Sequence, residues 1–222
     1  MVPISISNLS KEYDGVRVLE DLDLEVAPGE VFGYLGPNGA GKTTTIDILL
    51  DYVKPTTGTV EVFGHDANAE PVAVRDRIGV LPEGFAALER MTGRQHVEFA
   101  ISSKEADDDP EDLLELVDLG EVADRRAAHY SKGMGKRLGM ACALAGEPDL
   151  LVLDEPTAGL DPHGARFVRQ TVETLSSGGT AVFFSSHVLS QVEAVADRVG
   201  ILRDGRLEEV GSIEGLRAAS ET

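Results

Sequence analysis

The chain has 222 residues, with 39 acidic against 20 basic side chains and a formal net charge of −19. Nucleic acid and anionic lipid headgroups would both repel such a chain, which argues against direct binding to either. Its one cysteine, Cys142, excludes an internal disulfide. Because Cys142 lies in the apolar run 140–144, we expect a small buried hydrophobic side chain there rather than a nucleophile.

No apolar run approaches the length that spans a bilayer, and the first residues lack the basic region and apolar core of a signal peptide. We therefore expect a cytoplasmic protein that meets a membrane only through a partner. The acidic residues are spread along the chain, with a local cluster at 105–112. Two interpretations are open: a surface suited to high salt, where screening relieves self-repulsion, and an ordinary acidic cytosolic protein.

The first third of the sequence predicts strands joined by tight turns. Three runs alternate apolar and polar residues in the manner of half-buried strands. These runs are 4–9, 16–19 and 22–26, with turn dipeptides at 14–15 and 28–29. A strand bounded by glycines follows at 58–64, and a short buried strand is predicted at 78–81.

Residues 36–44 match the pattern G-x-x-x-x-G-K-[ST] of a phosphate-binding loop. The segment follows an apolar strand at 31–35 and opens an apolar-periodic helix at 43–50, which is the context that such a loop requires. Backbone amides and the positive end of the helix dipole would both face anionic oxygens. The residues expected to bind nucleotide are Gly36, Asn38, Gly39, Ala40, Gly41, Lys42, Thr43 and Thr44.

Two side chains of this loop have separate expected roles. Lys42 would reach the β- and γ-phosphates, and the hydroxyl of Thr43 would ligate Mg²⁺. A glycine-rich turn with an incidental lysine is the alternative, but strand, loop and helix all favour a phosphate loop. The sequence therefore predicts that the chain binds a nucleoside triphosphate.

The sequence changes character after residue 82. Residues 83–146 carry apolar side chains at helical spacing and predict a helical insert. Strand–helix alternation resumes with apolar strands at 150–153, 181–184 and 199–202, and a last strand and short helix are expected to finish by Thr222. Near-continuous apolar strands are typical of a parallel sheet that is covered on both faces.

Polar residues follow two of these apolar strands. Asp154 and Glu155 lie at the carboxyl end of one, the edge where ligands bind in open α/β sheets. We expect Asp154 to hold Mg²⁺, directly or through water, and Glu155 to polarise a water for in-line attack on the γ-phosphate. His187 ends another strand and should lie on the same edge, where it could stabilise the transferring group.

In motif order and spacing the chain resembles the ATP-binding subunit of an ABC transporter, over essentially its whole length. Tyr130-Ser131-Lys132-Gly133-Met134 is similar to the family signature LSGGQ, with three substitutions. Residues 154–162 are similar to the end of the Walker B motif and the D-loop, which includes Asp161. Glu83 lies at the position of the Q-loop glutamine, and Tyr13 lies where an aromatic residue stacks on adenine.

The resemblance implies an α/β fold: a P-loop NTPase (RecA-like) core with a mainly parallel sheet, an antiparallel β-subdomain at the N-terminal side and an inserted α-helical subdomain. Residues 1–222 would form a single ABC ATPase domain. Residues 1–82 and 147–222 would supply the core and β-subdomain, and 83–146 the insert with the signature. The resemblance also implies that two cassettes sandwich two ATP molecules, with Ser131 and Gly133 of one chain contacting the nucleotide of the other. A dimer is therefore required; we expect a homodimer, and a heterodimer with a second ABC ATPase subunit is the alternative.

The resulting hypothesis is an exporter-type, ATP-binding and ATP-hydrolysing motor subunit that dimerises on ATP. It would drive a separate membrane-spanning permease and lie on the inner face of the membrane through that partner. A soluble ABC-type ATPase that assembles or remodels a non-transport complex is the alternative. A regulatory subunit with inactive chemistry is a third class; the intact site residues Lys42, Asp154, Glu155 and His187 argue against it.

One departure from the family pattern bears on the metal. Glu83 adds a negative charge where the family more often has a neutral amide, and a carboxylate can ligate Mg²⁺. We therefore expect Thr43, Glu83 and Asp154 as metal ligands and an altered metal dependence. Gly84, Phe85, Leu88 and Met91, which follow it, are apolar or flexible. They would either dock on the membrane subunit or fill the core of the helical insert.

Overall fold

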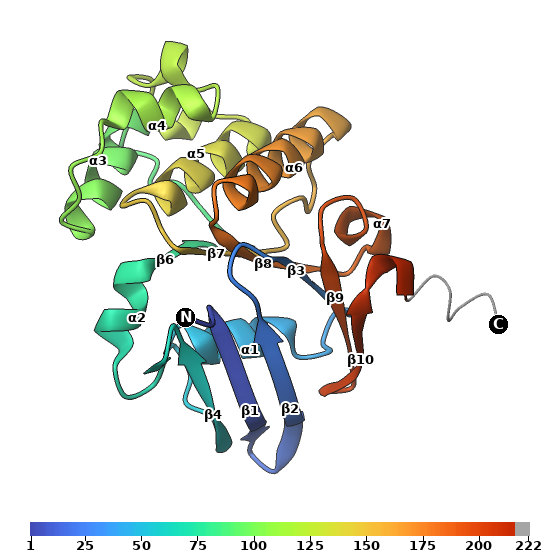
Figure 1. Cartoon of the computed structure of the whole chain (residues 1–222). Coiled ribbons are helices and arrows are strands. Elements are labelled where there is room, and N and C mark those ends of the chain that lie inside the picture. Colours follow the sequence, from blue (N-terminus) through green and yellow to red (C-terminus); the bar gives the residue numbers. More distant parts are fainter. Residues whose placement is uncertain (216–222) are drawn as a thin grey trace.

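The computed structural model describes residues 1–215, so the chain end expected by Thr222 lies outside the described residues. Within them, a six-stranded sheet of order β10-β9-β3-β8-β7-β6 forms the centre of the molecule (Figure 1). Its strands are β3 (Val31–Leu35), β6 (Ile78–Leu81), β7 (Leu150–Asp154), β8 (Ala181–Ser186), β9 (Arg198–Arg203) and β10 (Arg206–Ser212). All pair in parallel except β10, which runs antiparallel to β9. Every residue of β7 and β8 is buried, as expected for strands covered on both faces.

A second, antiparallel sheet is built mainly from the beginning of the chain. Its strands, in the order β2-β1-β4-β5, are β1 (Ile4–Tyr13), β2 (Val16–Val26), β4 (Thr57–Val62) and β5 (His65–Asp66). The prediction of separate strands at 16–19 and 22–26 is wrong, because both belong to β2. Asp21 takes a positive φ of 46° and the register shifts beside it, so the ladder continues through a bulge.

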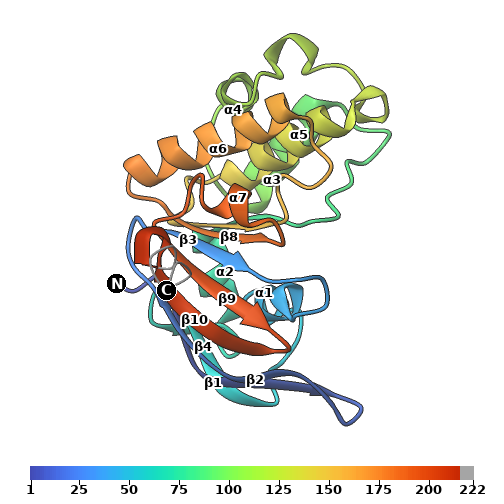
Figure 2. The ribbon, with the colours of Figure 1, turned by 90° about the vertical axis from the view of Figure 1, so that its right-hand side faces the viewer.

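Helices fill the space between the sheets and cover the outer face of the central sheet. Helix α1 (Lys42–Leu49) lies between the two sheets, while α3 to α6 lie over the opposite face of the central sheet (Figures 1 and 2). The remaining bounds are α2 (Pro71–Arg77), α3 (Gly93–Ser103), α4 (Pro110–Leu116), α5 (Lys132–Leu144), α6 (Pro162–Ser177), α7 (Leu189–Val192), and the 3-10 turns η1 (Gly120–Val122) and η2 (Ala127–His129). None of the helices in residues 1–215 has the length and apolar character to cross a bilayer.

Two apolar clusters hold these layers together. One joins α1 to both sheets around residues such as Ile4, Ile48 and Phe183, and the other packs α3 to α6 on the central sheet around residues such as Leu138 and Leu153. Burying an aliphatic or aromatic side chain contributes about 1.5–3 kcal/mol, so both clusters fix the relative positions of the layers. The predicted α/β class, with a mainly parallel sheet and an antiparallel sheet, is confirmed. The division of the chain at 82/83 and 146/147 stays a prediction.

Candidate nucleotide-binding and hydrolysis site

The loop between β3 and α1 is shaped by close packing on two other strands. A Cβ atom on Gly36 would lie 2.5 Å from the carbonyl oxygen of Leu202, and one on Gly41 would lie 2.5 Å from a methyl group of Leu19. Gly41 is also the N-cap of α1, with a φ of 111° that residues other than glycine rarely adopt. The loop therefore brings its backbone amides to the start of a helix, which is the arrangement that binds anions.

Lys42 links this loop to the end of β7. Its ammonium donates hydrogen bonds to the carbonyl oxygens of Gly36, at 2.8 Å, and Pro37, at 3.3 Å. The same nitrogen lies 3.3 Å from Oε1 of Glu155. Lys42 is 6% exposed and Glu155 is 4% exposed, and two charges buried this deeply require partners. The structure thus brings together two residues that are 113 positions apart in the chain.

Asp154 lies beside the first turn of α1. Its Oδ2 accepts a hydrogen bond of 3.2 Å from the hydroxyl of Thr43, and its Oδ1 accepts one of 2.5 Å from the hydroxyl of Ser185. Burial, and then the nearby Asp154 carboxylate, raise the pKa of Asp47 on α1. Carboxylate and hydroxyl oxygens are ligands that Mg²⁺ prefers, so Thr43 and Asp154 fit a magnesium site.

Glu155 has an unusual backbone and an unusual carboxylate. Its φ is 46°, in the left-handed region, and its amide donates to the hydroxyl of Ser185 at 3.0 Å. Oε2 lies 2.9 Å from Nδ1 of His187, whereas Oε1 is the one buried side-chain oxygen or nitrogen in residues 1–215 without a hydrogen bond. Lys42 is close to Oε1 but not aligned for a hydrogen bond with it. An acceptor of this kind is suited to binding the O–H of a water molecule.

His187 follows β8 and is held near Glu155 by a polar network. The amide of Val188 donates to the hydroxyl of Ser186. That hydroxyl and the hydroxyl of Thr157 both donate to Oε1 of Gln191, at 2.9 and 2.6 Å. This network joins the segment after Glu155 to the segment that contains His187. Sequence reasoning missed Ser185 and Gln191, since a lone hydroxyl or amide residue carries no pattern that marks such a role.

The signature segment lies at the start of α5. Ser131 is the N-cap, and its hydroxyl accepts a hydrogen bond of 3.2 Å from the amide of Met134. Ser131 is exposed and Gly133 is half-buried. The interactions described for Ser131 and Gly133 within residues 1–215 do not reach the phosphate loop. The side chain of Lys132 instead lies against Gly159, two residues before the N-cap of α6, Asp161.

Two other expected site residues lie on the surface. Tyr13 ends β1, is 41% exposed and has the ammonium of Lys11 4.6 Å from its ring centroid. The side chain of Glu83 is exposed. The backbone carbonyl oxygen of Glu83 accepts a hydrogen bond from the ammonium of Lys136. The structure describes no interaction of either side chain with Lys42, Thr43 or Asp154 among residues 1–215.

The fold and these contacts define a P-loop nucleotide-binding protein: a strand, a glycine-rich loop and a helix face the acidic end of β7, a buried strand separated from β3 by β8. Known proteins identify the family. The ABC transporter family matches residues 19–158, which include the phosphate loop, the signature segment and Glu155.

Individual relatives agree with this match. A daunorubicin resistance ATP-binding protein of Streptomyces coeruleorubidus is 40% identical over 220 residues, which are 97% of this chain and 70% of the relative. A bacitracin transport ATP-binding protein of Bacillus licheniformis is 38% identical over 93% of this chain and 68% of the relative. A solved ATP-binding subunit of an ABC transporter superposes with a TM-score of 0.89 and 28% identity over 100% of this chain and 94% of its own. The chain belongs to the ABC transporter family, as one of its nucleotide-binding domains.

Proposed function

We propose that the chain hydrolyses ATP to ADP and phosphate and that this hydrolysis drives a separate membrane-spanning permease. One observation carries the hydrolytic part of the proposal. The buried carboxylate of Glu155 is held between Lys42 and His187, with Oε1 free of hydrogen bonds in residues 1–215. This arrangement orients a carboxylate beside the phosphate loop, where it could accept a proton from an attacking water.

Each side chain has a distinct role in this proposal. Lys42 would leave its carbonyl partners and bind the β- and γ-phosphates, and His187 would donate a hydrogen bond to the γ-phosphate from the other side. Thr43 and Asp154 would hold Mg²⁺, with Glu83 as a further ligand. When bound, Mg²⁺ would neutralise part of the phosphate charge. Tyr13 would stack on the adenine ring, which its exposed position allows.

The proposed active unit is a homodimer. Ser131 and Gly133 are accessible at the amino end of α5, and their described interactions do not reach the phosphate loop of their own chain. A second copy could therefore place its signature segment against the nucleotide of the first. The amides at the start of α5 would then bind the γ-phosphate, and Asp161 would lie between the two sites. ATP would thus stabilise the dimer by mass action.

The permease partner and an exporter-type role are supported by relatives that are named for daunorubicin resistance and bacitracin transport. We place the subunit at the cytoplasmic face of the membrane, bound through that partner. Leu88, which is 61% exposed in the segment after Glu83, supports a docking surface there. Phe85 instead packs against Gly139 of α5, so the core-filling interpretation holds for that side chain.

The test compares Glu155→Gln with a matched variant of another buried glutamate. Glu30 is 7% exposed and is paired with Arg198, away from the phosphate loop. We expect Glu155→Gln to lower ATP turnover by about 100-fold or more while ATP binding persists, because the variant lacks only the proton acceptor. Glu30→Gln should keep its turnover. Normal turnover in Glu155→Gln would contradict the assigned role. The coupling to transport is tested by purifying the chain together with a membrane subunit and measuring how that subunit changes the rate of ATP hydrolysis.

A further inference from the structure

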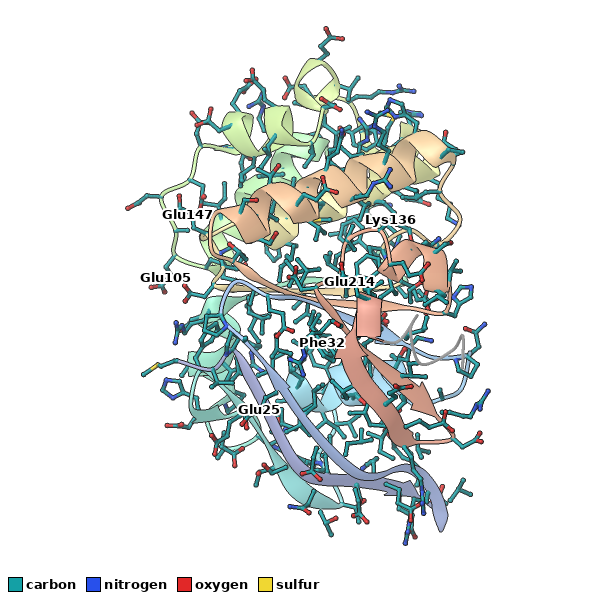
Figure 3. The ribbon with its side chains drawn as sticks, turned by 45° about the vertical axis from the view of Figure 1, so that its right-hand side comes forward. Glu25, Phe32, Glu105, Lys136, Glu147 and Glu214 are labelled. Atoms are coloured by element: carbon teal, nitrogen blue, oxygen red, sulfur yellow. The ribbon has the colours of Figure 1, made fainter. Side chains whose placement is uncertain are left out.

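Helix α5 carries a lysine that is buried where the helical layer meets the central sheet. Lys136 is 7% exposed, and Figure 3 labels it in this region. Its neighbours on the helix include the buried residues Leu138, Gly139 and Met140. Burying an ammonium group is costly unless it gains partners, so the contacts of Lys136 need an explanation.

Among residues 1–215, the ammonium of Lys136 donates hydrogen bonds to two backbone carbonyl groups. Its ammonium donates to the carbonyl oxygen of Glu83 at 3.1 Å and to that of Glu155 at 3.4 Å. Glu83 follows β6 and Glu155 follows β7, and these strands are parallel neighbours in the central sheet. One side chain of α5 therefore connects the chain segments that leave the sheet at the end of β6 and at the end of β7.

The charged groups around the Lys136 ammonium favour a cation at this position. Burial lowers the pKa of Lys136, while the carboxylates of Glu83, Asp154 and Glu155 favour its charged form. The signature lysine, Lys132, opposes them. Three carboxylates and one ammonium group thus act on Lys136, and their balance favours a cation at this position.

The backbone conformation of Glu155 is supported by hydrogen bonds to both its amide and its carbonyl group. A φ of 46° is unfavourable for a side chain of this size, so neighbouring groups must maintain it. Ser185 fixes the amide of Glu155, and Lys136 fixes its carbonyl group. The direction of the Glu155 carboxylate toward Lys42 and His187 follows from this backbone conformation.

We infer that Lys136 is a positioning residue for ATP hydrolysis, which holds the carbonyl groups of Glu83 and Glu155 and thereby orients the Glu155 carboxylate. This inference rests on the proposed function. Because Lys136 binds both carbonyl groups, a displacement of the segment after Glu83 would also shift the backbone of Glu155. A positioning error of about 1 Å at a catalytic group can lower a rate by about 100-fold, so a supporting cation can have a large effect.

The experiment compares Lys136→Met with Lys136→Arg and with a matched control. Lys104, the C-cap of α3, is a half-buried lysine whose ammonium also donates to backbone carbonyls, those of Arg75, Asp76 and Ile78. Lys104→Met removes the same group far from Glu155. Three properties are measured on each purified chain: ATP turnover, ATP affinity, and amide hydrogen exchange without nucleotide.

In Lys136→Met we expect turnover to fall about tenfold or more, with ATP affinity changed less than about threefold. Hydrogen exchange should rise about tenfold at residues 83–86 and 155–158, and not at these residues in Lys104→Met. Lys136→Arg should restore part of the turnover. In a Glu155→Gln background, Lys136→Met should cause little further loss, because it acts through Glu155.

The opposite results would overturn the inference. Unchanged turnover in Lys136→Met, or an equal loss in Lys104→Met, would show that Lys136 has no special link to Glu155. A full additional loss in the Glu155→Gln background would lead to the same conclusion. Failure of the proposed function is recognised separately, because the unmodified chain would then not hydrolyse ATP at all. The exchange measurement remains decisive in that case, since it needs no turnover.

Discussion

Lys42 and Glu155 form a buried ion pair, with Nζ 3.3 Å from Oε1, between the phosphate loop and the end of β7. Removing one member of such a pair leaves the other charge buried without its partner. The pair therefore ties nucleotide binding, stability and catalysis to the same two side chains.

The first prediction follows from this pair. Lys42→Met should lower the free energy of unfolding by up to about 3 kcal/mol, because the Glu155 carboxylate stays buried and loses one of the two ion-pair partners that it has in residues 1–215, keeping His187. It should also abolish tight ATP binding. In the double variant Lys42→Met with Glu155→Gln, part of the lost stability should return, since no charge is stranded. Urea unfolding measures both effects, and purely additive losses would contradict the ion pair.

The second prediction separates helix capping from dimer formation. Ser131 and Thr92 are both N-caps whose hydroxyls accept a hydrogen bond from a helix amide, in α5 and α3 respectively. Alanine at either position should lower stability by about 1 kcal/mol. Only Ser131→Ala should weaken ATP-dependent dimerisation, measured by ultracentrifugation in a Glu155→Gln background. Equal weakening by Thr92→Ala would mean that the effect is one of stability alone.

The third prediction concerns Glu83 and the metal. If its exposed carboxylate joins Thr43 and Asp154 around Mg²⁺, Glu83→Gln should shift the Mg²⁺ concentration that gives half-maximal turnover by about threefold or more. Glu89, another exposed glutamate in the same segment, provides the control variant Glu89→Gln. An activation curve that stays the same in Glu83→Gln would remove Glu83 from the metal site.

The fourth prediction concerns Cys142. Burial raises the pKa of its thiol to about 12, so the reactive thiolate is scarce at pH 8. A disulfide reagent should modify the folded chain about 100-fold or more slowly than the chain in urea. Because the thiol pKa is higher in the folded state, this group costs stability only as pH rises above about 9, the usual thiol value. Rapid labelling of the folded chain at pH 8 would contradict a raised thiol pKa at this half-buried position.

The fifth prediction concerns the net charge of −19. If the acidic surface is suited to high salt, raising KCl from 0.1 M to about 2 M should raise the melting temperature by about 5 °C or more, because salt screens the self-repulsion. An uncharged osmolyte of equal osmolarity serves as control. A melting temperature that does not respond to KCl would favour an ordinary acidic cytosolic protein.

Sequence patterns identified the phosphate loop, the buried strand before Asp154 and the helical character of residues 83–146, because each depends on local residue order. They did not identify α2 or α6 individually, although Asp161 and Pro162 form a recognisable N-cap and first turn for α6. They also split β2 in two, since a bulge at Asp21 reads like a turn.

The polar contacts of the site were harder to anticipate. Strand order placed His187 on the edge that carries Glu155, but it could not show that Ser185 and Lys136 hold the Glu155 backbone from opposite sides. Those contacts depend on side chains that approach from β8 and α5 only after the chain has folded. Sequence spacing has no signal for them, apart from the position of Lys136, which lies inside a helix whose residues are mostly small or apolar.

The close approach of Gly41 to Leu19, and of Gly36 to Leu202, has a consequence for protein engineering. Residues 36–44 pack closely against a side chain of β2 and the main chain of β9. The sequence pattern of the loop does not include residues of either strand. A graft of the nine residues into another strand–helix junction would transfer the sequence of the loop without the contacts to Leu19 and Leu202 that surround it. Conversely, enlarging Leu19 should disturb the loop although it lies outside the motif.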